Sequence, residues 1–248
     1  MCVMFGLRFF SGSVFDVVKQ VAGWIVRKEH VYVCVTGAHG IVESNQNFQV
    51  LRAHKAATLV VPDGMPLVWM GRLLGFPKTQ RIYGPDLFTA VCAEAQRKGW
   101  RIYLYGTTKE TLTALTSRLN TLFPRLIICG AYAPPFRQLA PDEDDDISKT
   151  ISEAKPHIVF VGLSTPKQEM WMYGHVKKVR ANVFIGVGAA FDFVAGTKKQ
   201  APIWMRKAGL EWSFRLMHEP RRLWTRYLLV NTRFIALAFW QLAHPHTN

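Results

Sequence analysis

Residues 186–196 read GVGAAFDFVAG, and they join an apolar run at 183–187 to a basic, tryptophan-rich tail. A short apolar run that ends in glycines is typical of a strand buried on both faces, followed by a tight turn. Backbone amides at such a turn can bind an anion. The cationic tail that follows therefore favours an anion-handling site at the end of this strand.

Apolar runs alternate with helical patterns through the rest of the chain. Runs with the length and content of buried strands lie at 31–36, 58–61, 101–105, 126–130, 157–162 and 183–187. Helical patterns lie near 42–53, 66–74, 86–98, 109–122, 144–154 and 167–179, and a capping box opens an earlier helix at 13–26. This alternation predicts an α/β, Rossmann-like fold with a mostly parallel sheet flanked by helices.

The chain beyond residue 200 has a helical pattern throughout. We therefore expect a Rossmann-like core at 1–200 and a basic, helical, membrane-associating appendage at 201–248. The segment 227–243 is apolar but contains Arg233, and an arginine near the middle of a membrane costs about 2.5–3.5 kcal/mol on insertion scales. The pattern favours a helix that either docks on the protein or lies on a membrane surface, and it leaves both open.

The charge of the chain predicts an anionic partner. The formal net charge is +14, so sugar phosphates, nucleic acid and acidic lipid headgroups all qualify. The four cysteines form no C-x-x-C element. We therefore expect buried, reduced thiols, as in a cytosolic protein, rather than a zinc or redox site.

Small and polar residues follow several of the predicted strands. In a doubly wound sheet, ligands bind just beyond the carboxyl ends of the strands, so these residues are expected to share a pocket. The candidates of this kind are Thr36, His39, Gly64, Gly106 and Gly188.

Asp63 is the strongest candidate for a catalytic group. It follows a predicted strand in the sequence VPDGMP at 61–66, which indicates a tight turn facing the crevice. A carboxylate in a partly dry site could take a proton from an incoming hydroxyl group. The alternative is an Asp-Gly turn whose carboxylate only caps the next helix.

Two more segments offer binding residues. Arg81 precedes a predicted helix and could bind a phosphate or carboxylate with two parallel hydrogen bonds. The alternative is a surface arginine paired with Asp86, the expected helix cap. Gln168 and Glu169 would lie in the first turn of another helix, where they could bind sugar hydroxyls or a uracil edge. A plain helix start with a favourable glutamate is the alternative.

The acidic run at 142–146 contains D-x-D, a manganese-binding pattern of many nucleotide-sugar enzymes. It follows a proline and opens a helix, so we interpret it as a solvated helix start. The histidines lack metal-ligand spacing, and the chain has no G-x-S-x-G, Walker or G-x-G-x-x-G motif. No metal and no cofactor are expected.

Taken together, these motifs resemble the TagA/WecG/CpsF family, glycosyltransferase family 26, over about residues 13–230. The matching stretches are PDGMPLVW at 62–69, RIYGPDL at 81–87, GL at 162–163 with PKQE at 166–169, GVGAAFDF at 186–193, and, in the tail, Glu211-Trp212, Arg215, Glu219-Pro220, Arg222 and Arg226-Tyr227. Many members have T-x-N after the first strand, where this chain has Thr36-Gly37-Ala38-His39, so the donor sugar is left open.

The resemblance implies a metal-independent, inverting transferase of bacterial cell-surface polysaccharide synthesis. It would move a sugar from a UDP-sugar to a polyprenyl-diphosphate-linked saccharide, as a cytoplasmic protein bound peripherally to the inner face of the cell membrane. The family's catalytic base maps to Asp63, its other pocket residues map to Thr36, Arg81 and Gln168, and its diphosphate-binding tail arginines map to Arg215 and Arg222, with Arg226 as the remnant of an arginine pair.

The expected partners are therefore the UDP-sugar, the lipid-linked acceptor and an anionic membrane surface, with a homo-oligomer left open and no nucleic acid. Two other classes remain as alternatives. A nucleic-acid-binding basic protein would use the tail, but the chain has none of the usual recognition motifs. An NAD- or flavin-dependent oxidoreductase could share the fold, but the dinucleotide fingerprint is missing.

Overall fold

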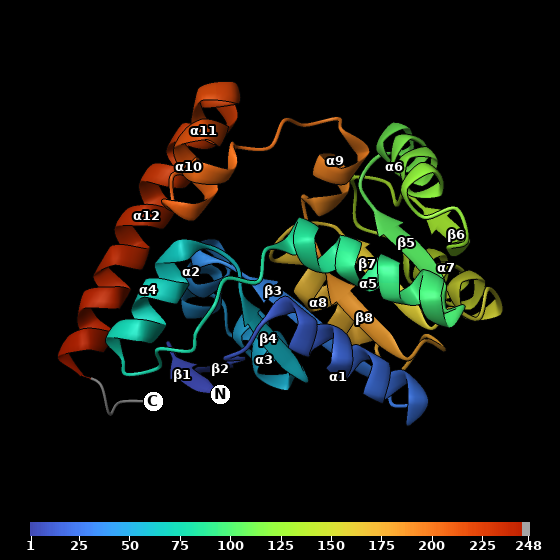
Figure 1. The fold of residues 1–248 in the computed structure, drawn as a ribbon, viewed down its shortest axis with the longest axis horizontal. Helices are drawn as coiled ribbons and strands as arrows, with labels where there is room; N and C mark the ends of the chain where they lie inside the picture. Colours follow the sequence, from blue (N-terminus) through green and yellow to red (C-terminus); the bar gives the residue numbers. More distant parts are fainter. Residues whose placement is uncertain (245–248) are drawn as a thin grey trace.

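The computed structural model describes residues 1–244, apart from the side chains of Arg222 and Arg226. Within this range an eight-stranded sheet lies between two layers of helices (Figure 1). The strand order is β1-β2-β4-β3-β8-β7-β5-β6, and all pairs are parallel except β1 with β2. The predicted fold class is confirmed. The strands are β1 (Cys2–Met4), β2 (Leu7–Phe9), β3 (Val31–Thr36), β4 (Leu59–Pro62), β5 (Arg101–Gly106), β6 (Ile127–Tyr132), β7 (Ile158–Gly162) and β8 (Val183–Gly186).

Each face of the sheet has its own hydrophobic core. One core is covered by α1 (Val14–Val26), α5 (Gly84–Lys98), α6 (Lys109–Leu122) and α9 (Ala190–Ala195). The other is covered by α2 (Ala38–Gln46), α3 (Phe48–Ala56), α4 (Met65–Leu73), α7 (Pro141–Glu153) and α8 (Lys167–His175). Alternate residues of β3 enter opposite cores, with Val33 in the first and Cys34 in the second. This two-sided burial explains why the central strands read as continuous apolar runs.

The structure differs from the predicted elements in three places. The pattern at 42–53 forms two helices, α2 and α3, because the Asn47 side chain accepts hydrogen bonds from the backbone amides of Gln49 and Val50 and starts a new helix. The β1–β2 hairpin was not predicted, since its strands are only three residues long. Asp86 lies in the first turn of α5 rather than at its cap, which is Tyr83.

The C-terminal appendage contains α10 (Ile203–Lys207), α11 (Glu211–His218) and α12 (Pro220–Ala243). In Figure 1, α12 runs along the edge of the core past α2, α4 and the β1–β2 hairpin. Its Leu223, Phe234 and Gln241 are buried, and Gln241 Oε1 accepts a hydrogen bond of 2.8 Å from the backbone amide of Phe5. The last helix therefore docks on the protein along one face.

The appendage also carries large apolar side chains that are exposed. They include Trp204, Trp224, Leu228, Ile235, Phe239 and Trp240. Across residues 1–244, no helix combines the length and the apolar content that crossing a membrane requires.

Candidate active site

Asp63 lies at the carboxyl edge of the sheet, directly after β4. Its backbone amide donates to Thr36 O at 2.8 Å, which ties the turn to the end of β3. A Cβ atom on Gly37 would lie 2.8 Å from Asp63 O, so the close approach of these two backbone segments requires glycine. The next residue, Gly64, has a φ of 107°, a conformation that favours glycine and turns the chain into α4. The local sequence thus aims the carboxylate away from the sheet.

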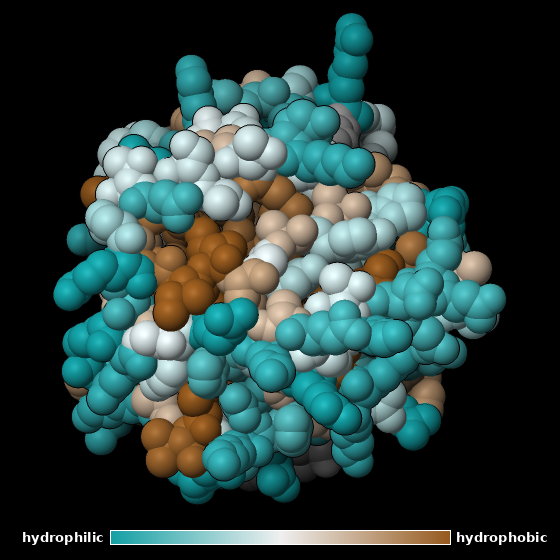
Figure 2. All heavy atoms as spheres, turned by 90° about the vertical axis from the view of Figure 1, so that its right-hand side faces the viewer, coloured by the Kyte–Doolittle hydropathy of each residue, from teal (hydrophilic) through white to brown (hydrophobic). Residues whose placement is uncertain are grey.

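A cavity of about 1270 Å³ opens beside Asp63, between the carboxyl edge of the sheet and the appendage. Figure 2 views the molecule from the right-hand side of Figure 1 and shows a group of apolar residues left of the middle of that face, bordered by hydrophilic side chains. Most of the residues predicted from the sequence line the cavity, and the structure brings them together. These are His39, Asp63, Gly64, Arg81, Gln168, Gly188 and Arg215.

Arg81 joins the catalytic candidate to the appendage. The backbone amide of Ile82 donates to Pro62 O at 2.9 Å, which places the Arg81 segment alongside the end of β4. The Arg81 guanidinium donates from Nε and from Nη2 to Asp63 Oδ1, both at 3.3 Å, and from Nη1 to Arg206 O at 3.1 Å. The alternative pairing with Asp86 is wrong, because Arg81 pairs with Asp63, and Asp86 Oδ1 instead lies 3.9 Å from Arg206 Nη1.

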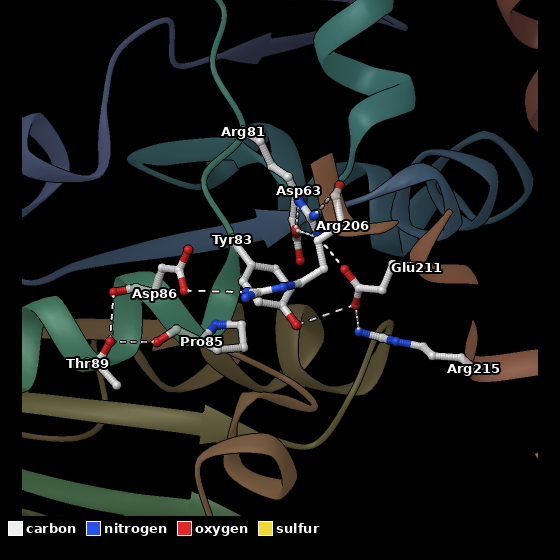
Figure 3. Close-up of polar contacts among 9 residues, drawn as sticks. All are labelled: Asp63, Arg81, Tyr83, Pro85, Asp86, Thr89, Arg206, Glu211 and Arg215. Carbon is white, nitrogen blue, oxygen red and sulfur yellow. Dashed lines mark hydrogen bonds and ion pairs between the residues drawn. The ribbon is translucent and has the colours of Figure 1, made fainter. Parts of the chain in front are cut away.

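Glu211, the first residue of α11, lies between two arginines of the cavity (Figure 3). Its Oε2 accepts a hydrogen bond of 2.6 Å from Arg81 Nη2, and its Oε1 accepts one from Arg215 Nη2. The Tyr83 hydroxyl donates to Oε1 at 3.5 Å, and the Tyr83 ring lies under the Arg81 guanidinium with 4.3 Å to the ring centroid. Arg215 in turn lies over the ring of Phe193.

The surroundings set the protonation of both carboxyl groups. The Asp63 side chain is 28% exposed, toward the cavity. Burial on its other sides raises the pKa of Asp63 above its ordinary value; Arg81 and Arg215 oppose the rise, and the Glu211 charge adds to it. Burial also works to raise the pKa of Glu211, but the charges of Arg215 and Arg81 outweigh it and the net shift is downward. The two pKa shifts therefore run in opposite directions, upward for Asp63 and downward for Glu211.

Gln168 lies in the wall of the cavity, and one of its acceptors is unused within the described part of the chain. Its Nε2 donates to Glu169 Oε1 at 2.9 Å, and the Thr165 hydroxyl donates to the same oxygen at 2.9 Å. Among the described residues, Gln168 Oε1 is buried without a hydrogen-bond partner. A Cβ atom on Gly188 would lie only 3.4 Å from that oxygen, so a larger residue at position 188 would press on the Gln168 amide.

Three of the predicted site residues lie behind the cavity wall instead of in it. Thr36 is 1% exposed, and its hydroxyl lies 3.0 Å from Nε2 of buried His54. Glu169 is fully buried and contacts the cavity through Gln168. Gly106 does not line the cavity either, and a Cβ atom there would meet the backbone of Gly162 at 2.6 Å. These residues support the pocket from outside.

The basic tail contributes further residues to the cavity. Lys198, Lys199, Arg215 and His218 line it, and Lys198 pairs with Glu219 at 3.3 Å. The side chains of Arg222 and Arg226 lie outside the described part of the chain, so their predicted roles stay predictions.

The acidic run forms the first turns of α7, as the sequence predicted. Asp144 lies 2.9 Å from His175 Nε2 and 2.8 Å from Lys178 Nζ, and Glu143 pairs with Arg137 at 2.6 Å. In the described range no three potential metal-ligating side chains come together. Whether the reaction needs a metal stays a prediction.

Sequence reasoning missed Glu211 and Tyr83 as site residues. A signal was present for Glu211, since it is one of only two acidic residues in a tail rich in arginine and lysine. Tyr83 carried no such signal, because its role depends on α11 folding back over it.

The class of the protein follows from comparison with known families. Residues 2–248 match the family described as the glycosyl transferase WecG/TagA/CpsF family, so the chain belongs to that family and is a glycosyltransferase. This membership favours the glycosyl-transfer interpretation over the nucleic-acid and oxidoreductase alternatives.

Curated relatives cover most of the chain. It is 33% identical, over 78% of its length and 72% of the relative's, to an N-acetylglucosaminyldiphosphoundecaprenol N-acetyl-beta-D-mannosaminyltransferase of Bacillus subtilis (strain 168). Proteins of the same name from Bacillus spizizenii and Staphylococcus aureus (strain MW2) are each 31% identical, over 76% and 88% of the chain and 71% and 85% of the relatives.

Proposed function

We propose that the protein is an inverting glycosyltransferase that moves a sugar from a UDP-sugar to a polyprenyl-diphosphate-linked saccharide. The observation that carries the proposal is the position of Asp63, a carboxylate with a raised pKa that faces a large cavity bounded on one side by the appendage and its Arg215. The names of the relatives support a lipid-linked N-acetylglucosamine acceptor.

The chemistry assigned to Asp63 is general-base catalysis. The carboxylate takes the proton of the acceptor hydroxyl as its oxygen attacks the anomeric carbon of the donor sugar. The bond from that carbon to the diphosphate oxygen breaks, and UDP leaves with the electron pair. One direct displacement inverts the anomeric centre. Proton removal of this kind contributes roughly 10²–10⁴-fold to a rate, provided that the base is poised near the working pH.

Side chains of the cavity are assigned to the leaving diphosphate. Charge that develops on UDP is stabilised best by preorganised cations in a site shielded from water. Arg215, Lys198, Lys199 and His218 line the cavity at its appendage side and suit this task. The proposal includes transfer without a metal ion, with Arg215 and the two lysines in its place.

The appendage is assigned a second task at the membrane. Its exposed tryptophans and its basic residues have the composition of an interfacial surface, which would hold the protein peripherally on the inner, anionic leaflet where a polyprenyl-linked acceptor resides. Docking of α12 through its other face leaves this surface available.

The experiment that tests the proposal uses the full-length protein. A panel of UDP-sugars, including UDP-N-acetylhexosamines, is incubated with a synthetic N-acetylglucosaminyl-diphosphate-polyprenyl acceptor. We expect one donor to give a lengthened lipid-linked product with an inverted anomeric configuration. Absence of any product across the panel, or retention of configuration, would contradict the proposal.

A further inference from the structure

Glu211 is a buried acidic residue in an appendage that is rich in arginine. Only 8% of it is exposed, and both of its carboxylate oxygens are used, Oε2 by Arg81 and Oε1 by Arg215 and Tyr83. A pocket built only to attract anions would not need a carboxylate between two of its cations. Its position therefore requires a separate explanation.

The distances around Arg81 suggest what Glu211 does. Arg81 Nη2 lies 2.6 Å from Glu211 Oε2, whereas Nε and Nη2 both lie 3.3 Å from Asp63 Oδ1. Charge-assisted N–H···O bonds are usually about 2.7–2.9 Å long, and guanidinium groups favour two parallel bonds to one carboxylate. Arg81 thus makes its close contact with Glu211 and only a loose one with Asp63.

We propose that Glu211 is a positioning residue that holds the Arg81 guanidinium away from Asp63 and thereby keeps Asp63 available as a base. This inference rests on the proposed function, because it concerns the base of that reaction. Because Glu211 belongs to α11, Asp63 would be an effective base only when the appendage is docked on the core.

The charged groups around Asp63 support this assignment. Arg81 comes from the segment before α5, Arg215 and Glu211 come from α11, and Tyr83 lies beneath Arg81. Arg81 and Arg215 lower the basicity of Asp63, and Glu211 is the carboxylate that opposes them. Without the Glu211 charge, Arg81 would be free to close on Asp63 as a bidentate pair, which would favour the ionised form and weaken the base.

The competing explanation is a mechanical one, in which Glu211 only fastens α11 to the core. If Glu211 had this structural role alone, its substitution would affect the melting temperature and substrate binding, but it would leave the pH dependence of the chemical step unchanged. The pH dependence therefore separates the two roles.

The test compares Glu211→Gln, which removes the charge but keeps the shape, with Glu211→Asp, which keeps the charge. Glu94→Gln is the matched control, because Glu94 pairs with Arg97 on the outside of α5. The rate of sugar transfer to the lipid-linked acceptor is measured across pH, and the Asp63 carboxyl is titrated by ¹³C NMR, with Asp63→Asn identifying its signal.

In Glu211→Gln we expect the acidic limb of the pH–rate profile and the Asp63 titration to move to lower pH. We expect kcat to fall about tenfold, which is less than the full contribution of a general base to the rate. Glu211→Asp is expected to keep the acidic limb near its wild-type position, and Glu94→Gln to match the wild type. If Glu211→Gln unfolds, Glu211→Asp is compared with the uncharged Glu211→Ser. A smaller shift of the acidic limb in Glu211→Asp than in Glu211→Ser supports the inference, and equal shifts overturn it.

An Asp63 titration and an acidic limb that stay in place in a folded Glu211→Gln protein would overturn the inference, even if kcat fell. Failure of the proposed function would look different, because the wild-type protein would then give no transfer at all. The NMR titration would still report the influence of Glu211 on Asp63 in that case.

Discussion

Arg81 contacts only one oxygen of Asp63, Oδ1, with two nitrogens that are each 3.3 Å away. Among the described residues no hydrogen bond reaches Asp63 Oδ2, so this oxygen is the one available to an acceptor hydroxyl. The arrangement orients the carboxylate without neutralising it tightly. It also predicts how the activity depends on pH.

The pKa of Asp63 is raised, chiefly by burial, so the acidic limb of kcat/KM should lie above the ordinary pKa value of an aspartate. Asp63 must be ionised to act as a base, and activity is therefore lost as the pH falls through this raised pKa. A pH–rate profile of the wild-type enzyme measures the limb directly. A limb at or below the ordinary pKa value of an aspartate would contradict this assignment.

Chelation tests the metal-independent mechanism. Because Asp144 and Glu143 pair with His175, Lys178 and Arg137, we expect the acidic run to have no part in catalysis. Transfer should survive exhaustive treatment with EDTA. Loss of activity that returns with manganese or magnesium would reverse this view.

A pair of glycine substitutions tests the packing at the carboxyl edge of the sheet. Gly106 has a φ of +126°, and a Cβ atom there would meet the Gly162 backbone, so Gly106→Ala should lower the free energy of unfolding by about 2 kcal/mol or more. Gly174, in α8, has no atom within 4 Å of such a Cβ, so Gly174→Ala should be neutral or stabilise the protein by about 0.5–1 kcal/mol. Chemical denaturation measures both, and equal effects would contradict the packing described.

Vesicle binding tests the exposed face of α12. Replacing Trp224 and Phe239 with serine should weaken binding to anionic vesicles about tenfold or more, since fully burying one such side chain is worth roughly 1.5–3 kcal/mol. The melting temperature should hardly change, because both side chains are exposed. Phe15→Ser, on α1, is the control. Equal losses in the control and the double variant would place the membrane contact elsewhere.

The sequence predicted the sheet well because its strands are buried on both faces and leave continuous apolar runs. The sequence also predicted that Asp63, Gly64, Arg81 and Gln168 share one site, because each follows a strand or precedes a helix at the same edge of the sheet. Such local signals are enough to place residues near a ligand when the topology is a parallel α/β sheet.

Long-range contacts could not be predicted in the same way. Arg81 and Glu211 are 130 residues apart, and their pairing depends on how the appendage folds back onto the core. Thr36 was expected in the pocket because it ends a strand. Its hydroxyl instead contacts the buried His54, which belongs to α3, and the sequence gives no sign of this contact. The break at Asn47 depends on a single capping side chain within a continuous helical pattern.

The central claim is that Asp63 is the base of a glycosyl transfer, and Asp63→Asn tests it most directly. The variant keeps the size of the side chain and its place beside Arg81, but an amide cannot take the acceptor proton. Transfer to the lipid-linked acceptor and UDP binding are measured on the same preparation, with Asp142→Asn, at the exposed start of α7, as the control. We predict a loss of turnover of roughly a hundredfold or more in Asp63→Asn, with UDP affinity and fold retained. Turnover close to that of the wild type would remove Asp63 from the catalytic role and contradict the account.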